Sequence, residues 1–398
     1  MSAEILDRPT ARTSKRITGL DAARGIALMG MIAIHVLPSF TEDFEPTLVW
    51  RIASGTSAAL FAFLAGVGLS LAMGKRSGSG PGLRAAKAAL ATRGVLIAAI
   101  GLLLGQLVVP AAIILVYYGV MFALAVPLLG LSARALFAWS IGFASIGAIV
   151  SQLLGGAVPT LGIEDPSLSS VFTDFGGTLG TLFVGGSFPA LTWMTYICAG
   201  LAVGRLDLAS FDVQLRLFLA GVAAALSTAV FSALLLGPLG IRDRLAWNPG
   251  ERFSPEEVGD ILTWGPLDDE PLLSGWWQVM LSPYSHSMFE LINTLGVALA
   301  VFAAMVFIGQ RVAWLLTPLS ILGSMTLSLY AMHLVFLSLG VLSDRPFLSF
   351  WIQCGAGLLF ALLWRNVTGR GRGPLEQPIA LAANRSSERA LASGRHSR

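Results

Sequence analysis

Three ionisable residues, Asp21, Arg24 and His35, stand in one apolar stretch that is long enough to cross a membrane. On a helix that advances about 100° per residue, all three fall within about 60° of one another on one face. Arg24 and His35 are then about 16 Å apart along the axis, roughly half the hydrocarbon thickness. Ionisable side chains inside a span face a bundle interior or a wet cavity, so this stripe predicts a functional site. The alternative is an interfacial Asp21–Arg24 salt bridge with His35 in the outer leaflet.

Two further histidines, His286 and His333, are predicted at the same outer level as His35. Glu290 follows His286 by four residues, and a helix would place both on one face. A carboxylate in that position could orient the ring and raise its basicity, as in general bases. Structural roles stay open for all of them. Glu290 would also suit the first turn of a helix, and His333 could hydrogen-bond a neighbouring helix.

Arg205 closes an apolar segment on the predicted inner side of the membrane. An arginine there would meet the phosphates of a cofactor, or would simply extend toward the interface. The two cysteines, Cys198 and Cys354, both lie within apolar segments. They suggest neither a disulfide framework nor a metal site, and the sequence predicts no metal.

The composition predicts the fold class that must position these residues. Of the 398 residues 55% are hydrophobic and 12% charged, whereas soluble domains have about a quarter charged residues. The chain is therefore predicted to be an all-α polytopic transmembrane bundle, because the apolar runs lack the alternation of barrel strands. About ten helices are expected, at 17–38, 49–73, 90–109, 112–130, 135–155, 187–204, 215–239, 286–309, 317–341 and 347–364.

Charge along the chain predicts the topology and the partners. Basic segments stay in the cytoplasm, which places both termini there and indicates contact with anionic membrane lipids rather than with nucleic acid. We expect a basic cytoplasmic segment at 1–16, one bundle over 17–365, and an acidic extracytoplasmic loop at 241–285. The tail 366–398 is expected to be cytoplasmic and disordered. The helix count depends on 156–186, which could hold a re-entrant piece.

Several stretches resemble a known family. The segment from Arg16 to His35, with Asp21-x-x-Arg24-Gly25, resembles the opening of heparan-alpha-glucosaminide N-acetyltransferase-like and YeiB-like bacterial membrane proteins. Its Arg-to-His interval is also similar to the first helix of integral-membrane sugar O-acyltransferases. Further similar stretches lie at 188–205, 283–290, 323–333 and 373–376, so the resemblance covers most of the membrane core.

The resemblance implies acyl transfer across a bacterial plasma membrane. Members with known activity pass an acyl group, usually acetyl, from cytoplasmic acyl-CoA to a glycan hydroxyl or amine on the far side. Carried over, His35 would be the catalytic histidine, as general base or transient acyl carrier, and Arg24 would meet the phosphates. His286, Glu290 and His333 are its candidate partners, and Asp21 and Arg205 are candidates at the cofactor end. The expected acceptor is an envelope glycan or glycolipid, and the sequence leaves a homodimer open.

Two other functions stay open at this stage. A transporter or flippase of an envelope metabolite would line its path with the same polar stripe, and a membrane scaffold would need no chemistry. Acyl transfer predicts acyl-CoA binding and a requirement for His35, whereas transport predicts neither.

Overall fold

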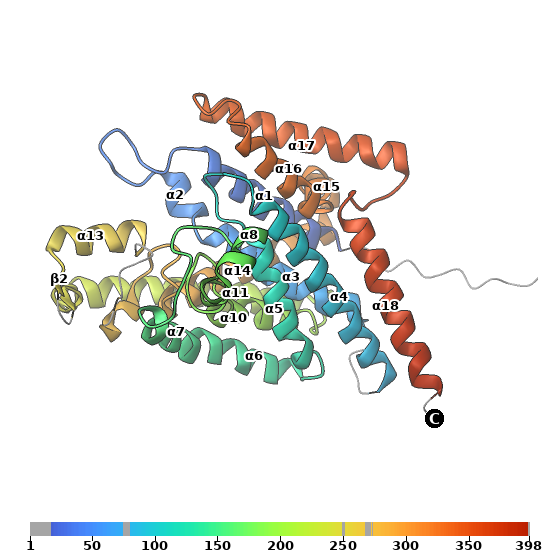
Figure 1. The fold of residues 1–398 in the computed structure, drawn as a ribbon, viewed down its shortest axis with the longest axis horizontal. Coiled ribbons are helices and arrows are strands. Elements are labelled where there is room, and N and C mark those ends of the chain that lie inside the picture. The colour runs from blue at the N-terminus through green and yellow to red at the C-terminus, as the bar shows by residue number, and fades with distance from the viewer. Residues whose placement is uncertain (1–16, 75–79, 249–250, 267–271, 273, 397–398) are drawn as a thin grey trace, which may run out of the picture.

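The computed structural model describes residues 17–74, 80–248, 251–266, 272 and 274–396. Apart from its connecting segments the described part is helical, with one antiparallel pair of two-residue strands (Figure 1), and the predicted basic segment 1–16 lies outside it. The elements are α1 (Thr18–Val36), α2 (Leu48–Ala53), α3 (Thr56–Met73), α4 (Pro81–Leu104), α5 (Leu115–Leu128), α6 (Ala133–Gly142), η2 (Phe143–Gly147), α7 (Ala148–Gly155), α8 (Leu168–Thr173), α9 (Phe175–Phe183), α10 (Ala190–Val203), α11 (Phe211–Leu236), α12 (Arg242–Leu245), β1 (Trp247–Asn248), β2 (Glu251–Arg252), α13 (Pro255–Trp264), η3 (Gly275–Val279), α14 (Met288–Arg311), η4 (Ala313–Leu316), α15 (Thr317–Gly323), α16 (Thr326–Ser338), α17 (Pro346–Thr368) and α18 (Glu376–His396).

Every one of the ten predicted apolar runs contains helix, and the protein is a polytopic helical membrane protein. Seven helices among the described residues are long and apolar enough to cross a membrane. Helices α15 and α16 are bent by 59° at their junction, and together they add an eighth span if the pair is counted as one span. The remaining two predicted spans correspond to the shorter apolar helices α5 and α10. The segment 156–186 holds α8 and α9, of six and nine residues, which are too short to span.

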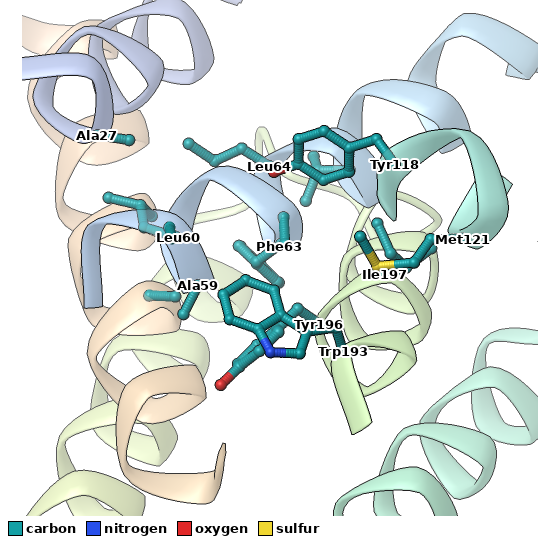
Figure 2. Close-up of a cluster of buried hydrophobic side chains, with 14 of the residues drawn as sticks. Ala27, Ala59, Leu60, Phe63, Leu64, Tyr118, Met121, Trp193, Tyr196 and Ile197 are labelled. Carbon is teal, nitrogen blue, oxygen red and sulfur yellow. The ribbon is translucent and has the colours of Figure 1, made fainter. Parts of the chain in front are cut away.

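Helix α1 packs against α3, α14, α15 and α17, and it runs antiparallel to α14. Gly19, near the start of α1, approaches the backbone of Met305 and Val306, near the end of α14. The end of α1, where His35 lies, is therefore beside the start of α14. Figure 2 shows the core that α1 shares with α3, α5 and α10, in which Phe63 of α3 is fully buried. This packing buries the face of α1 that carries Ala27.

The predicted loop 241–285 forms a small folded cap with its own core. Helices α12 and α13 and the β1–β2 hairpin surround Phe253, Val258 and Trp277, all of which are buried. Trp50 of α2 donates its indole N–H to the backbone carbonyl of Thr263 at 3.1 Å, which ties the cap to the bundle. In Figure 1 the cap lies at one end of the long axis and α18 runs toward the other.

The tail predicted to be disordered is helical. Helix α18 packs along α4 (Figure 1), and the hydroxyl of Thr92 donates to that of Ser386 at 2.7 Å. Ile379, Ala380 and Ala383 of α18 are buried. The arginines and serines suggested a solvated tail, but these apolar positions give α18 a face that α4 covers. The C-terminal segment is part of the bundle.

Candidate active site

At the start of α1, Arg24 lies between a carboxylate and a glycine of the neighbouring helix. Its Nη1 is 3.4 Å from Oδ1 of Asp21, one helical turn earlier, and the Asp21 side chain is buried. The guanidinium also crosses α3 at Gly68, where an added Cβ would collide with Nη2. Any side chain at position 68 would have to displace Arg24, so the glycine leaves room for its present orientation.

Three further arginines gather with Arg24. Arg93 of α4 and Arg372 of the α17–α18 connection line the same cavity, of about 350 Å³, and Arg93 interacts electrostatically with both of the others. Arg24 and Arg372 also line an adjoining cavity of about 720 Å³, together with Arg370. Guanidinium groups around a shared cavity offer the paired N–H donors that bind phosphate in bidentate geometry. These four residues are called the arginine cluster below.

The 350 Å³ cavity follows α1 toward its other end. Arg24 and Met31 both line it, about 10 Å apart along the helix axis. Tyr118 of α5 and Tyr330 of α16 line it as well. Because Met31 lies one turn before His35, the cavity extends from the arginine cluster to the turn of α1 that precedes this histidine.

His35 begins a chain of hydrogen bonds that joins three helices. Its Nδ1 lies 3.0 Å from Nε2 of His333 on α16, and Nδ1 of His333 lies 2.6 Å from Oε1 of Gln353 on α17. The amide nitrogen of Gln353 donates in turn to the hydroxyl of Ser349 at 3.1 Å. His333, Gln353 and Ser349 are buried, whereas His35 is half-buried at the end of the chain.

The hydrogen-bond network assigns the protons of this histidine pair. Because the amide oxygen of Gln353 only accepts, Nδ1 of His333 carries its proton and Nε2 of His333 is an acceptor. Nδ1 of His35 therefore donates to that nitrogen, and the lone pair of His35 remains on Nε2. A neutral imidazole held by one nitrogen, with the other unprotonated, is the state that a general base requires.

His286 lies at the same end of the bundle, but among the described residues its partners are different. Its Nδ1 accepts the indole N–H of Trp193 at 3.3 Å, and its Nε2 donates to the carbonyl of Gly186 at 3.2 Å. Burial lowers the pKa of His286 to about 4. Its φ of 54° is in the left-handed region, which few residues other than glycine adopt. The three histidines thus resolve into one pair and one separate side chain.

The predicted pairing of His286 with Glu290 does not form. Helix α14 begins at Met288, and the hydroxyl of Ser287 accepts the backbone N–H of Glu290. His286 therefore precedes the helix, and a spacing of four residues no longer implies a shared face. Glu290 is buried beside Gly55, and its Oε2 has no hydrogen-bond partner within the described residues.

Arg205 was predicted at the cofactor end together with Arg24, but it hydrogen-bonds another part of the bundle. Its Nη2 donates to the backbone carbonyl of Leu129, just after α5, at 2.8 Å, and burial lowers its pKa. It lines neither cavity of the arginine cluster. Arg93 and Arg372 line the cavity with Arg24 instead, and neither of them was predicted from the sequence as a site residue.

A third cavity, of about 510 Å³, lies between the cap and the bundle and is called the cap cavity below. The aromatic side chains of Trp264 and Tyr284 line it, together with the amides of Gln152 and Gln278 and the ring of His286. None of the described residues around it is Asp, Glu, Lys or Arg. Nor does the described part of the chain contain a group of three or more His, Cys, Asp and Glu side chains that could hold a metal ion.

Comparison with known proteins identifies a family whose model matches the chain. The model of the family described as heparan-alpha-glucosaminide N-acetyltransferase, catalytic, matches residues 16–231, more than half of the chain. The matched range contains Arg24, His35 and Arg93 but ends before His333 and Arg372. No curated protein matches the chain.

Proposed function

Because the chain belongs to the heparan-alpha-glucosaminide N-acetyltransferase catalytic family, we propose that it transfers acetyl groups from cytoplasmic acetyl-CoA to an envelope glycan or glycolipid across the membrane. Membership makes the protein an N-acetyltransferase-like membrane enzyme. The donor, the acceptor and a bacterial plasma membrane are the finer parts of the proposal. The observation that supports them best is the cavity that begins at the arginine cluster and ends one turn before His35.

The arginine cluster fits the donor's phosphates. Arg24, Arg93 and Arg372 face one cavity, on which Glu376 is the one carboxylate among the described lining residues, and Asp21 beside Arg24 is buried. An extended molecule with phosphates at one end would leave its other end near Tyr118 and Tyr330. The thioester supplies an activated acyl carbon at that end, and the protein supplies position and proton transfer.

The histidine pair suits the proton transfer. In the proposed reaction Nε2 of His35 takes the proton from the amine or hydroxyl of the acceptor. At the same time the nitrogen or oxygen of the acceptor bonds to the acyl carbon, and the carbon–sulfur bond of the thioester breaks. His35 then returns the proton to the departing thiolate, so protons balance over the cycle. The hydrogen bond from Nδ1 of His35 to Nε2 of His333 keeps the ring in place in both protonation states.

The cap cavity suits the acceptor. It lies at the end of the bundle that carries His35. Tyr284 on its wall interacts electrostatically with Tyr330, which lines the 350 Å³ cavity of the arginine cluster. Its aromatic rings, amides and hydroxyls can stack on and hydrogen-bond a saccharide unit. The absence of cations among its described lining residues favours an acceptor without sulfate or carboxylate groups.

Donor binding gives the first test. In Arg24→Ala we expect acetyl-CoA binding to weaken by about 1.5–3 kcal/mol, the range for hydrogen bonds to charged groups. This corresponds to roughly a tenfold to hundredfold increase in Kd, measured by calorimetry on purified protein. Arg205→Ala is the matched control and leaves Kd unchanged, because Arg205 does not line the cavity. An unchanged Kd in Arg24→Ala contradicts the donor site.

Product formation separates the remaining functions. We expect an acetyl-sized mass difference in envelope glycans between cells with and without the protein, and we expect His35→Gln to abolish it. A transporter, for which the broken α15–α16 span would be typical, gives acyl-CoA-independent flux that survives this substitution. A scaffold gives neither result. The mass difference would also identify the acceptor.

Labelling tests the orientation on which the proposal depends. Positions 43 and 80 are both exposed and lie at opposite ends of the α2–α3 span, while Cys198 and Cys354 are buried. We expect Asp43→Cys to react with an impermeant thiol reagent from outside the cell and Gly80→Cys to react only after permeabilisation. The reverse pattern places the arginine cluster outside and contradicts donor binding from the cytoplasm.

A further inference from the structure

Helix α16, which carries His333, begins inside the bundle. The break after α15 leaves its first backbone N–H groups without helical partners, as at any helix start. In water such groups are solvated, but here the residues of this first turn lie inside the bundle, and Thr326 and Leu327 line the cavity of the arginine cluster. The side chain of Met325, directly before the helix, provides no cap. Another segment has to satisfy these donors.

The carboxylate of Glu376 satisfies them from the start of α18. Its Oε1 accepts the backbone N–H groups of Leu327 at 2.8 Å and Ser328 at 3.1 Å, and its Oε2 accepts the Ser328 hydroxyl at 2.5 Å. The backbone N–H of Leu375 donates to the same hydroxyl at 3.1 Å. Gly373 allows this approach, because an added Cβ there would collide with Oε2 of Glu376. Four contacts thus join the C-terminal segment to the first turn of α16.

The contact lies between the two halves of the proposed site. Glu376 lines the same cavity as Arg24 and Arg372, whereas Tyr330 and His333 follow its partners on α16 within two turns. Helix α18 is itself fixed along α4. A change in the angle at which α16 starts would move His333 relative to His35, and their hydrogen bond is 3.0 Å long.

We propose that Glu376 is a positioning residue, which holds the start of α16 so that His333 reaches His35. It acts through α16 and does not bind the donor. The inference rests on the proposed function only for its kinetic consequences. The position of the histidine ring can be measured without any reaction.

The kinetic test compares Glu376→Ala with Glu388→Ala, an exposed residue of the same helix. We expect Glu376→Ala to lower kcat roughly tenfold or more, the effect of losing about 1.4 kcal/mol of transition-state stabilisation. The KM for acetyl-CoA should change less than twofold, and Glu376→Gln should recover part of kcat because its amide oxygen still accepts. Ser328→Ala removes one contact and should give a smaller loss. An unchanged kcat overturns the proposal, and so does a rise in the KM for acetyl-CoA, which would place Glu376 in the donor site.

The structural test uses the small number of histidines. The chain has four, so ¹⁵N labelling of histidine gives a spectrum that single-histidine substitutions can assign. We expect Glu376→Ala to change the ring signals of His333 and His35 and to leave those of His286 unchanged. If the wild-type protein transfers no acetyl group, the proposed function fails while this result still decides the role of Glu376. Unchanged signals of the His35–His333 pair contradict it.

Discussion

His35 and His286 lie at the same end of the bundle, but their ring nitrogens have different partners. His286 uses both nitrogens, one toward the indole of Trp193 and one toward the carbonyl of Gly186. Within the part of the chain that the structure describes, His35 uses one nitrogen, toward His333, and its Nε2 is assigned the lone pair. A histidine whose nitrogens are both engaged can fix a backbone segment, whereas a base needs a nitrogen that is held and a nitrogen that is free.

The surroundings of His286 and His35 also differ. The hydrogen bonds of His286 hold a left-handed residue before α14 against the start of α10. The hydrogen bond of His35 is supported by Gln353 and ends beside a cavity that begins at charged residues. Three histidines at one level therefore do not form one catalytic group. We expect substitutions to separate an activity phenotype at His35 from a stability phenotype at His286.

The largest expected effect is the loss of activity in His35→Gln. Removing a general base lowers kcat roughly 10²- to 10⁴-fold, and acetyl transfer by the purified protein measures it. Glutamine can keep one hydrogen bond to His333, so the thermal midpoint should stay within a few degrees. Activity near the wild-type level would show that His35 does not differ from His286 in the proposed way.

A smaller loss is expected in His333→Phe. The substitution keeps a ring in the buried site but removes the acceptor for Nδ1 of His35, so the imidazole loses its orientation and tautomer. One hydrogen bond of about 1 kcal/mol corresponds to a several-fold to tenfold decrease in kcat, with KM for acetyl-CoA unchanged. A decrease as large as that of His35→Gln would instead indicate that His333 is the base.

The local sequence pattern was sufficient to predict the helices, but it was not sufficient to predict the site. Each apolar run of spanning length became helix because lipid leaves the backbone few alternatives. Position along one helix was also predictable, which is why Arg24 and His35 were found on the stripe of α1. The break at Ser324 and the packing of α18 depend on contacts between distant segments, and no local pattern gives those.

At the site one predicted pairing was wrong and two residues were not predicted, and the reasons differ. The pairing of His286 with Glu290 assumed a helix through both residues, although the spacing Ser287-x-x-Glu290 is typical of a helix start and was available in the sequence. Gln353 and Arg372 required the fold, because α17 and the segment after it meet α16 and α1 only in three dimensions. The one local signal for Gln353 was a polar amide within the apolar run 347–364.

His286→Ala tests the other side of the comparison. It leaves the indole N–H of Trp193 and the carbonyl of Gly186 without their partner, and Ala adopts a left-handed φ poorly. Unpaired buried groups destabilise by about 1–3 kcal/mol, which thermal unfolding in detergent can measure. The kcat of the folded fraction should stay close to wild type. A loss of kcat without a loss of stability would assign His286 to the reaction.

The smallest effect is a pH dependence of stability that belongs to His286 alone. Its folded pKa of about 4 lies below the ordinary value of about 6.5, because burial disfavours the charged ring. Between these values the unfolded chain binds a proton that the folded protein does not, so this contribution is complete above pH 6.5 and is lost as the pH falls toward 4.

From about pH 7.5 to pH 5.5 the loss from this one group amounts to about 1.4 kcal/mol. His286→Asn is the matched variant, because asparagine tolerates a positive φ and offers an oxygen to Trp193 but does not titrate. We expect its thermal midpoint to fall less than that of the wild type over this pH range. Equal decreases in both proteins would mean that His286 is protonated in the folded state without penalty. Its Nδ1 would then not be held as an acceptor, and the contrast with His35 would no longer follow from the hydrogen bonds.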